Sequence, residues 1–324
     1  MNQSIERVRA VISGQMPDRT PLFDLLRNSA VIRHFTGVEL TVENGAELVY
    51  KAYAPAIDAT RPTVKHPARE ETVTLPDGRR QHVRRWTAWT ERRHYADSAA
   101  YACDVRRRLA AFDPTWTAAG HSALDATLAA FAADRRRLGE VFYVPDIPGP
   151  FLMGLYGEVG LEHFSYYLAD CPDAITGLLE MHTAYAESWY HHLPANHGIE
   201  AGFLGDDIAF KSGPLFSPAW MRKHYFPRLG RAVAAAHARG IKVLFHSDGN
   251  LNPILDDLVA AGIDGLNPIE VLAGMDVGDI HRRHLRLFLA GGIDVSQLLP
   301  FGTPGQVREA VRKAIDAAEG RLLV

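Results

Sequence analysis

The sequence predicts one α/β domain that spans residues 1–324 and folds as a (β/α)8 barrel, also called a TIM barrel. Its 324 residues match the usual size of such a barrel. Short apolar runs alternate with helical segments along most of the chain, as parallel strands joined by helices require. No Gly-x-Gly-x-x-Gly motif follows the first apolar run, which disfavours an open dinucleotide-binding sheet.

The expected strands are short, and most of them end in polar residues. Helix-start residues follow some of them: Ser217 precedes Pro218 and Thr303 precedes Pro304, which is the preferred chemistry of a helix N-terminus. The eight expected strands are Thr20–Asp24, Ala56–Thr60, Phe142–Val144, Gly202–Gly205, Val243–His246, Gly265–Asn267, Leu285–Ala290 and Leu322–Val324.

Three features modify this plain barrel. Residues 4–13 have helical periodicity, and we expect this N-terminal helix to cover one end of the barrel. Two alternating runs flank Pro76-Asp77-Gly78, which is typical of an inserted β-hairpin over residues 71–89. The chain ends at Val324, so we expect strand eight to be truncated and loosely ordered.

Composition excludes several classes of function. The formal net charge of −3 provides no positive field for nucleic acid or an anionic membrane surface. Prolines interrupt the apolar stretch around residues 142–155, so no run reaches the length of a membrane span. Cys103 and Cys171 form no paired motif, which fits a reducing compartment. We expect a cytoplasmic protein that binds neither nucleic acid nor membrane.

Polar residues gather after the expected strands, where barrel enzymes have their active sites. Burying several carboxylates at one barrel mouth is costly unless they share a metal ion, a cationic group or protons. His246 and Asp248 stand two residues apart and offer an imidazole nitrogen and a carboxylate oxygen, both zinc ligands. Glu270 is the third expected ligand, and a hydrogen-bonded core histidine is the alternative for His246. The strand-end candidates are Asp24, Asp58, Asp146, Asp206, Asp207, His246, Asp248, Glu270 and Asp294.

Several motifs occur in a characteristic order along the chain. Combined, they resemble the uroporphyrinogen decarboxylase superfamily, which also contains the cobalamin and coenzyme M methyltransferases. The motifs are Arg7–Gly14 with Pro17–Pro21, Gly205–Ile208, Phe216–Pro218, Tyr225–Pro227, His237–Gly249, Gly262–Glu270, Gly274–Asp276 and Gly291–Asp294.

The resemblance to the decarboxylases implies roles for three residues. In those enzymes a strand-two aspartate binds pyrrole NH groups, and a tyrosine after strand three contacts the substrate. Asp58 and Tyr156 resemble these two positions. Arg27 is the plausible counterpart of the arginines that receive the substrate carboxylates.

The resemblance to the methyltransferases implies a zinc ion. Those enzymes ligate zinc through a His-x-Cys motif in strand five and a cysteine after strand eight. Here Asp248 stands at the first cysteine position, so the implied ligands are His246, Asp248 and Glu270. Among the remaining strand-end carboxylates, we assign Asp207 to catalysis and Asp206 and Asp294 to substrate binding.

We favour metal-assisted methyl transfer, with a corrinoid or a corrinoid protein as the methyl partner. The first alternative is cofactor-free decarboxylation of uroporphyrinogen in porphyrin biosynthesis, with Asp58 stabilising a protonated pyrrole. The second alternative is non-catalytic binding of a tetrapyrrole or another small molecule. The barrel predicts that Asp58, Asp207, His246 and Glu270 open on one cavity at the C-terminal ends of the strands.

Overall fold

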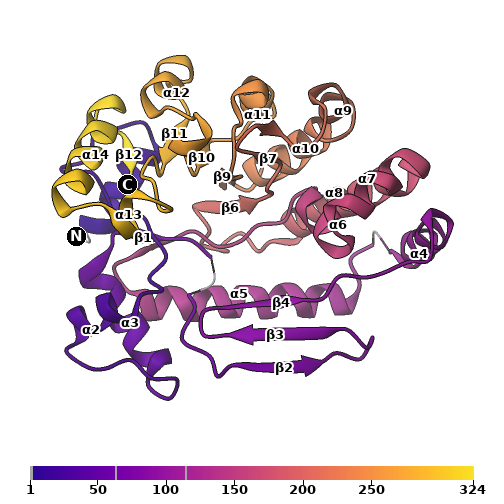
Figure 1. Cartoon of the computed structure of the whole chain (residues 1–324), viewed down its shortest axis with the longest axis horizontal. Coiled ribbons are helices and arrows are strands. Elements are labelled where there is room, and N and C mark those ends of the chain that lie inside the picture. Colours follow the sequence, from indigo (N-terminus) through magenta and orange to yellow (C-terminus); the bar gives the residue numbers. More distant parts are fainter. Residues whose placement is uncertain (1–2, 63, 114) are drawn as a thin grey trace.

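Parallel strands form the interior of the molecule, and helices cover them on the outside (Figure 1). The computed structural model describes residues 3–62, 64–113 and 115–324. The parallel strands are β1 (Ala59–Thr60), β5 (Phe142–Tyr143), β6 (Ala201–Gly205), β9 (Lys242–His246), β10 (Gly265–Asn267), β11 (Phe288–Ala290) and β12 (Leu322–Leu323). They confirm the α/β class.

The parallel strands are assigned to two sheets, and backbone hydrogen bonds connect these sheets. β1 pairs with β5, and β6, β9, β10, β11 and β12 form a five-stranded sheet. Asp146 bridges to Phe203, and Phe23 bridges to Ala59. Val324 bonds Pro21 and Phe23 at 3.0 and 2.7 Å. Backbone hydrogen bonds thus connect each expected strand with the next one. The first expected strand, Thr20–Asp24, contributes only the bridge at Phe23 and forms no strand of its own. We call these connected segments the ring.

The last strand differs from the expectation of loose order. Leu322 and Leu323 are buried, and both pair with β11. Val324 continues the contact to the first expected strand. Because both sides of this segment are hydrogen-bonded, β12 is an integral part of the ring.

Helices follow the expected pattern, with one split. The segment before β9 forms two helices that are divided at Tyr225, because Pro227 cannot donate the backbone hydrogen bond that would continue the first helix. The helices are α1 (Gln3–Ile12), α2 (Ser29–Thr36), α3 (Gly45–Ala56), α4 (Ser98–Ala111), α5 (Ala118–Leu138), α6 (Leu152–Val159), α7 (Leu161–Asp170), α8 (Pro172–His192), α9 (Pro218–His224), α10 (Phe226–His237), α11 (Leu255–Ala260), α12 (Val277–Arg283), α13 (Leu298–Phe301) and α14 (Pro304–Ala317).

The predicted hairpin is present with a third strand. β2 (Glu71–Thr74), β3 (Arg80–Arg84) and β4 (Thr87–Thr90) form an antiparallel sheet whose residues are mostly exposed. In Figure 1 this sheet lies along the lower edge, apart from the parallel strands. A further short hairpin, β7 (Ala209–Phe210) with β8 (Gly213–Pro214), follows β6.

Strand alternation decides which side chains point into the ring. Phe203 of β6 and Leu244 of β9 belong to an apolar cluster inside the ring, whereas their neighbours Leu204 and Phe245 pack against the helices. Helix α1 contributes Val8, Val11 and Ile12 to the inner cluster. The predicted N-terminal helix therefore closes one end of the ring.

Asp58 lies at this closed end. Its buried carboxylate accepts hydrogen bonds from Arg19 at 2.7 and 2.8 Å, from Ser4 at 2.8 Å and from the backbone of Leu22 at 2.9 Å. Arg7 of α1 forms an ion pair with it at 3.3 Å. Burial alone would raise the pKa of Asp58, but these donors outweigh burial and lower it.

The prediction that Asp58 shares a cavity with His246 is therefore wrong. In β1, the side chain of Ala59 faces into the ring. Because side chains alternate along a strand, Asp58 does not face into the ring, whereas Arg61 faces inward at the other end of the strand. Asp58 connects α1 to the ring.

Replacing Asp58 with alanine should lower the free energy of unfolding by about 2–4 kcal/mol, because two arginines and a backbone N–H lose a buried acceptor. Chemical denaturation at neutral pH measures this change. Asp18 also pairs with Arg7 but is 60% exposed, so Asp18→Ala should cost less than about 1 kcal/mol. Equal losses in the two variants would contradict this role.

Candidate functional site

Three side chains converge at the open end of the ring. Asp207 follows β6, His246 ends β9, and Asp248 lies two residues further. One potential ligand atom from each residue lies within 4.8 Å of the others, a spacing that can hold one metal ion. Nε2 of His246 is 3.8 Å from Oδ1 of Asp207. We call these residues the triad.

The register of three strands creates this convergence. Gly205 of β6 pairs with His246 of β9, and His246 pairs with Asn267 of β10. His246 lies two residues after the inward-facing Leu244 in the same strand, so its side chain also points into the ring. Asp207 lies two residues after Gly205, and this places its carboxylate beside His246.

Asn267 determines which nitrogen of His246 faces the triad. Its side-chain amide donates to the carbonyl of Ala290 at 3.1 Å, which directs its oxygen toward His246. That oxygen lies 2.7 Å from Nδ1 of His246 and can only accept, so Nδ1 donates. In the neutral ring, Nε2 then carries the free lone pair and faces Asp207, as a metal ligand requires.

The electrostatic environment keeps His246 neutral. Burial and then Arg61 lower the pKa of His246. Burial raises the pKa of Asp248, against the attraction of the imidazole. The triad thus favours a neutral imidazole at physiological pH, which is the protonation state that binds metals.

Backbone contacts hold Asp207 in place. Its Oδ1 accepts a hydrogen bond from the backbone N–H of Asp248 at 2.9 Å, which joins the two loops of the triad. Tyr156 of α6 donates its hydroxyl to the carbonyl of Asp207 at 2.7 Å, and burial raises the pKa of this tyrosine. Tyr156 lies at the site as expected, but its hydroxyl proton is used to position Asp207.

Glu270 does not belong to the group of ligand atoms. Its carboxylate accepts the backbone N–H of Gly249 at 2.7 Å and lies 3.9 Å from Lys211. Gly249 has φ +92° and approaches the backbone of Ala209 so closely that a Cβ would lie 2.6 Å from the carbonyl carbon of Ala209. Glu270 therefore supports the loop that carries Asp248, and Asp207 takes the place we expected for it.

Two predicted substrate-binding carboxylates are occupied by protein groups. Asp206 is fully buried and accepts hydrogen bonds from the backbone of Leu152 and Met153 and from Tyr225, so it anchors the start of α6. Asp294 accepts hydrogen bonds from residues 296–298 and shapes its own turn. Both carboxylates thus have structural roles within the protein.

Cationic side chains line the side of the open end that the first two strands supply. Arg61 points inward, and its guanidinium carbon lies 4.6 Å from the centre of the Phe203 ring. The His246 ring is 4.9 Å from the same ring centre. Burial, and next the like charge of Arg27, lower the pKa of Arg61. Asp146, which follows β5, is exposed, and partial desolvation by its surroundings raises the pKa of its carboxyl against the attraction of Arg61.

Sequence reasoning missed Arg61 and Asn267. The inward direction of both side chains follows from the alternation along a strand. Arg61 lies two residues after the inward-facing Ala59, and Asn267 lies two residues after Gly265 in the strand next to His246. Their signal was available only after the register was known.

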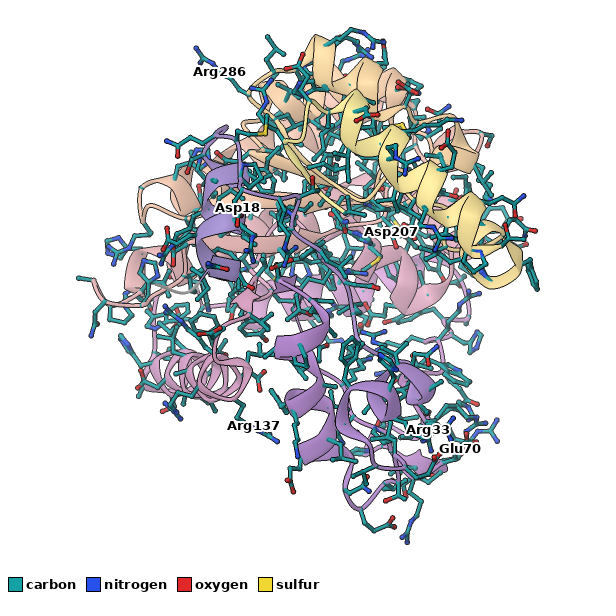
Figure 2. All side chains as sticks on the ribbon, turned by 90° about the vertical axis from the view of Figure 1, so that its left-hand side faces the viewer. Asp18, Arg33, Glu70, Arg137, Asp207 and Arg286 are labelled. Carbon is teal, nitrogen blue, oxygen red and sulfur yellow. The ribbon has the colours of Figure 1, made fainter. Side chains whose placement is uncertain are left out.

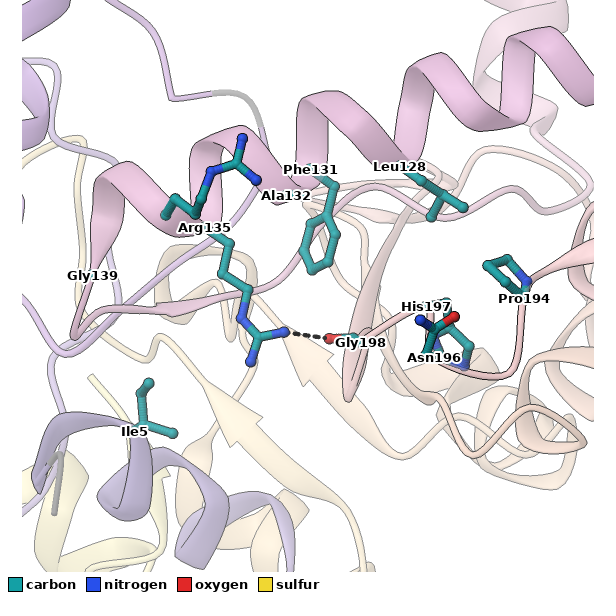
Figure 3. Close-up of a pocket in the computed structure, with 11 residues that line it drawn as sticks. Ile5, Leu128, Phe131, Ala132, Arg135, Gly139, Pro194, Asn196, His197 and Gly198 are labelled. Carbon is teal, nitrogen blue, oxygen red and sulfur yellow. Dashed lines mark hydrogen bonds between the residues drawn. The ribbon is translucent and has the colours of Figure 1, made fainter.

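A separate surface groove of about 560 Å³ contains none of the expected site residues (Figure 3). It lies between α5 and the loop before β6, where Arg135 donates a hydrogen bond to the carbonyl of Gly198 at 3.1 Å. Ile5 of α1 borders it, which places the groove toward the closed end.

Among the described helices, none is both long and apolar enough to cross a membrane.

The sequence shows the family of the protein. Residues 153–322 match the sequence model of the family described as Uroporphyrinogen decarboxylase (URO-D). The chain belongs to this family. The matched region contains the whole triad, Asn267 and Tyr156. No curated protein matches the chain.

A solved structure shares the fold of this family member. A methyltransferase from Methanosarcina mazei superposes with a TM-score of 0.66 and 18% sequence identity. The superposition covers 98% of this chain and 90% of the other. The fold similarity therefore includes the N-terminal region that lies outside the family match.

The buried carboxyl of Asp206 predicts a pH dependence of stability. Burial raises its pKa to about 6, so the folded chain retains a proton that the unfolded chain releases near pH 4. Its contribution is complete below pH 4 and is lost as the pH rises to 6, by about 1.4 kcal/mol per pKa unit. Asp206→Asn removes this loss, so its stability relative to the unsubstituted protein should rise between pH 4 and 6.

Denaturation curves from pH 4 to 7 measure this difference, and Asp294→Asn is the control. Local hydrogen bonds outweigh burial and lower the pKa of Asp294, so its contribution is lost on acidification instead. A difference for Asp206→Asn that stays constant across this range would contradict the prediction.

Proposed function

We propose that this chain is a (β/α)8-barrel enzyme that catalyses metal-assisted methyl transfer, with a corrinoid or a corrinoid protein as the methyl partner. The observation that carries the proposal is the convergence of Asp207, His246 and Asp248 at the open end of the ring. The methyltransferase with the same fold supports the choice of reaction class.

The donor atoms of the triad fit a zinc ion. One neutral imidazole and two carboxylates form a three-ligand set that leaves a coordination position for substrate. Asn267 holds the imidazole from behind, as residues around metal-binding histidines commonly do. When bound, zinc supplies Lewis acidity that lowers the pKa of an acceptor thiol or polarises the leaving group of a methyl donor.

The protein groups around the triad have separate tasks in this proposal. A bound corrinoid would supply the methyl group, and a protein group would have to receive the proton that the acceptor loses. Asp146 follows β5 on the same side of the ring as Arg61, and we assign its carboxylate to receive that proton. The Phe203 ring provides an apolar wall beside His246.

Exposed apolar side chains surround the open end and support a macromolecular methyl partner. They lie in the segments that follow β6, β10 and β11, and clusters of this kind mark interaction surfaces. These residues are Phe210, Leu272, Val295, Leu299 and Phe301, with 47–79% of each exposed.

The position of Asp58 does not support the role that our decarboxylation hypothesis gave it. That hypothesis needs an unpaired carboxylate from strand two in the pocket, and Asp58 is bound by Arg19 at the closed end. The strand instead presents Arg61, a cation that repels a protonated pyrrole. Non-catalytic binding of a small molecule is an outcome of the tests below.

The zinc content of the purified protein tests the proposal. The unsubstituted chain should bind one zinc per molecule, and His246→Ala should lose it while remaining folded, because the site adds little to the core. The unsubstituted chain with zinc should also demethylate methylcobalamin in the presence of 2-mercaptoethanol, and His246→Ala should not. Elemental analysis and anaerobic absorbance spectroscopy measure these changes.

His237 provides a matched control. It also pairs with a carboxylate, Asp264 at 2.7 Å, but Asp264 precedes β10 and lies away from the triad. His237→Ala should keep both zinc and activity. An unsubstituted protein without zinc above background would overturn the metal-assisted mechanism, and zinc without demethylation would favour simple binding.

Asn267 should act as a positioning residue for His246. Asn267→Ala leaves the imidazole without its partner, and we expect the zinc affinity to fall about 10–100-fold. Competition with a chromogenic chelator measures the affinity. Asn267→Asp retains the acceptor and should restore most of it, whereas an unchanged affinity in the alanine variant would contradict the role.

A further inference from the structure

The two carboxylates of the triad lie on loops beyond the paired ends of β6 and β9. At these ends, the backbone N–H of Asp206 donates to the carbonyl of His246 at 2.9 Å. The next N–H, that of Ser247, instead donates to the carbonyl of Asn267 in β10 at 3.0 Å. The backbone hydrogen bonds between β6 and β9 therefore end before the two carboxylates, whose spacing depends on side-chain contacts.

The hydroxyl of Ser247 joins the two loops. Its Oγ accepts a hydrogen bond from the backbone N–H of Ile208 at 3.0 Å and donates to the backbone carbonyl of Asp248 at 2.9 Å. Ser247 and Ile208 are both buried, so water does not compete for these contacts. We call this hydroxyl and its two backbone partners the clamp.

The clamp acts on Asp207 through the peptide bond that follows this residue. Tyr156 donates to the carbonyl oxygen of this peptide at 2.7 Å, and Ser247 accepts a hydrogen bond from its N–H, which belongs to Ile208. A planar peptide that is held at both of its polar ends has little freedom to rotate. The backbone position from which the Asp207 carboxylate extends is therefore fixed.

The same hydroxyl also holds Asp248. It donates to the carbonyl of Asp248, and the N–H of Asp248 donates to Oδ1 of Asp207 at 2.9 Å. Ser247 thereby connects the loop of one carboxylate to the backbone of the other. Because a metal ion tolerates only small displacements of its ligand atoms, this connection preorganises the site before a metal binds.

We propose that Ser247 is a positioning residue that fixes the spacing of the Asp207 and Asp248 carboxylates for a metal ion. Backbone groups occupy its hydroxyl on both sides, so Ser247 acts through the two loops and not as a ligand. The inference rests on the proposed function only in treating the triad as a metal site, and it does not depend on methyl transfer.

Removal of the Ser247 hydroxyl tests the clamp. Ser247→Ala keeps all three ligand side chains but leaves the N–H of Ile208 without its acceptor, and we expect the zinc affinity to fall about 10–100-fold. Competition with a chromogenic chelator measures the affinity. Cobalt(II) bound in place of zinc should also show altered visible absorption bands, because these bands report the coordination geometry. Ser247→Thr retains the hydroxyl and should restore most of both properties.

Control variants separate positioning from stability. Thr183 of α8 is another buried hydroxyl, which donates to the carbonyl of Leu179 at 2.7 Å, and Thr183→Val should keep the zinc affinity and the cobalt spectrum. Arg286 lies at the outer edge of the molecule, far from Asp207 (Figure 2), so Arg286→Gln should also keep both. Ser247→Cys has a side chain of similar shape with a weaker acceptor, and it repeats the test if the alanine variant does not fold.

An unchanged zinc affinity in folded Ser247→Ala would overturn the clamp. A lower affinity with an unchanged cobalt spectrum would indicate a role in stability alone and would overturn it too, as would an unsubstituted protein that binds neither metal. Both changes in Ser247→Ala, in a chain whose unsubstituted form binds zinc but does not demethylate methylcobalamin, would support the clamp while the proposed function fails.

Discussion

The parallel register of β6, β9 and β10 is the constraint on which the site depends. It places Gly205, His246 and Asn267 side by side and directs the latter two side chains into the ring. A shift of one residue would turn His246 toward the helices and separate it from Asp207. Because helices cover the outer faces of these strands with apolar contacts, such a shift would also bury polar groups, so the core enforces the register.

The two ends of the ring have different tasks. At the closed end, α1 fills the interior with apolar side chains, and Asp58 pairs with Arg7 and Arg19. At the open end, Asp207, His246 and Asp248 converge, and within the described residues no arginine or lysine forms an ion pair with either carboxylate. Ion pairs that satisfy one another contribute to stability, whereas groups without partners are available to ligands.

Neighbouring carboxylates illustrate how the environment determines their roles. Asp206 and Asp207 are adjacent in sequence, yet Asp206 is buried against the start of α6 and Asp207 faces the triad. Asp248 belongs to the triad as well, and in the part of the chain that the structure describes no backbone N–H donates to its carboxylate. A metal or substrate can therefore engage Asp207 and Asp248, while Asp206 supports the loops around them.

The sequence by itself determined the α/β class, most strand positions, the N-terminal helix, the inserted hairpin and the family. It also selected His246 and Asp248 as candidates, and the structure brings these two side chains together. These conclusions rest on periodicity, turn residues and motifs, which are local properties of the chain. Only the tertiary structure decided that Asp207 replaces Glu270 in the triad, that Asp58 belongs to the closed end and that Arg61 faces His246. Strand parity and register produce these differences, because contacts between distant strands depend on pairings that no single segment encodes.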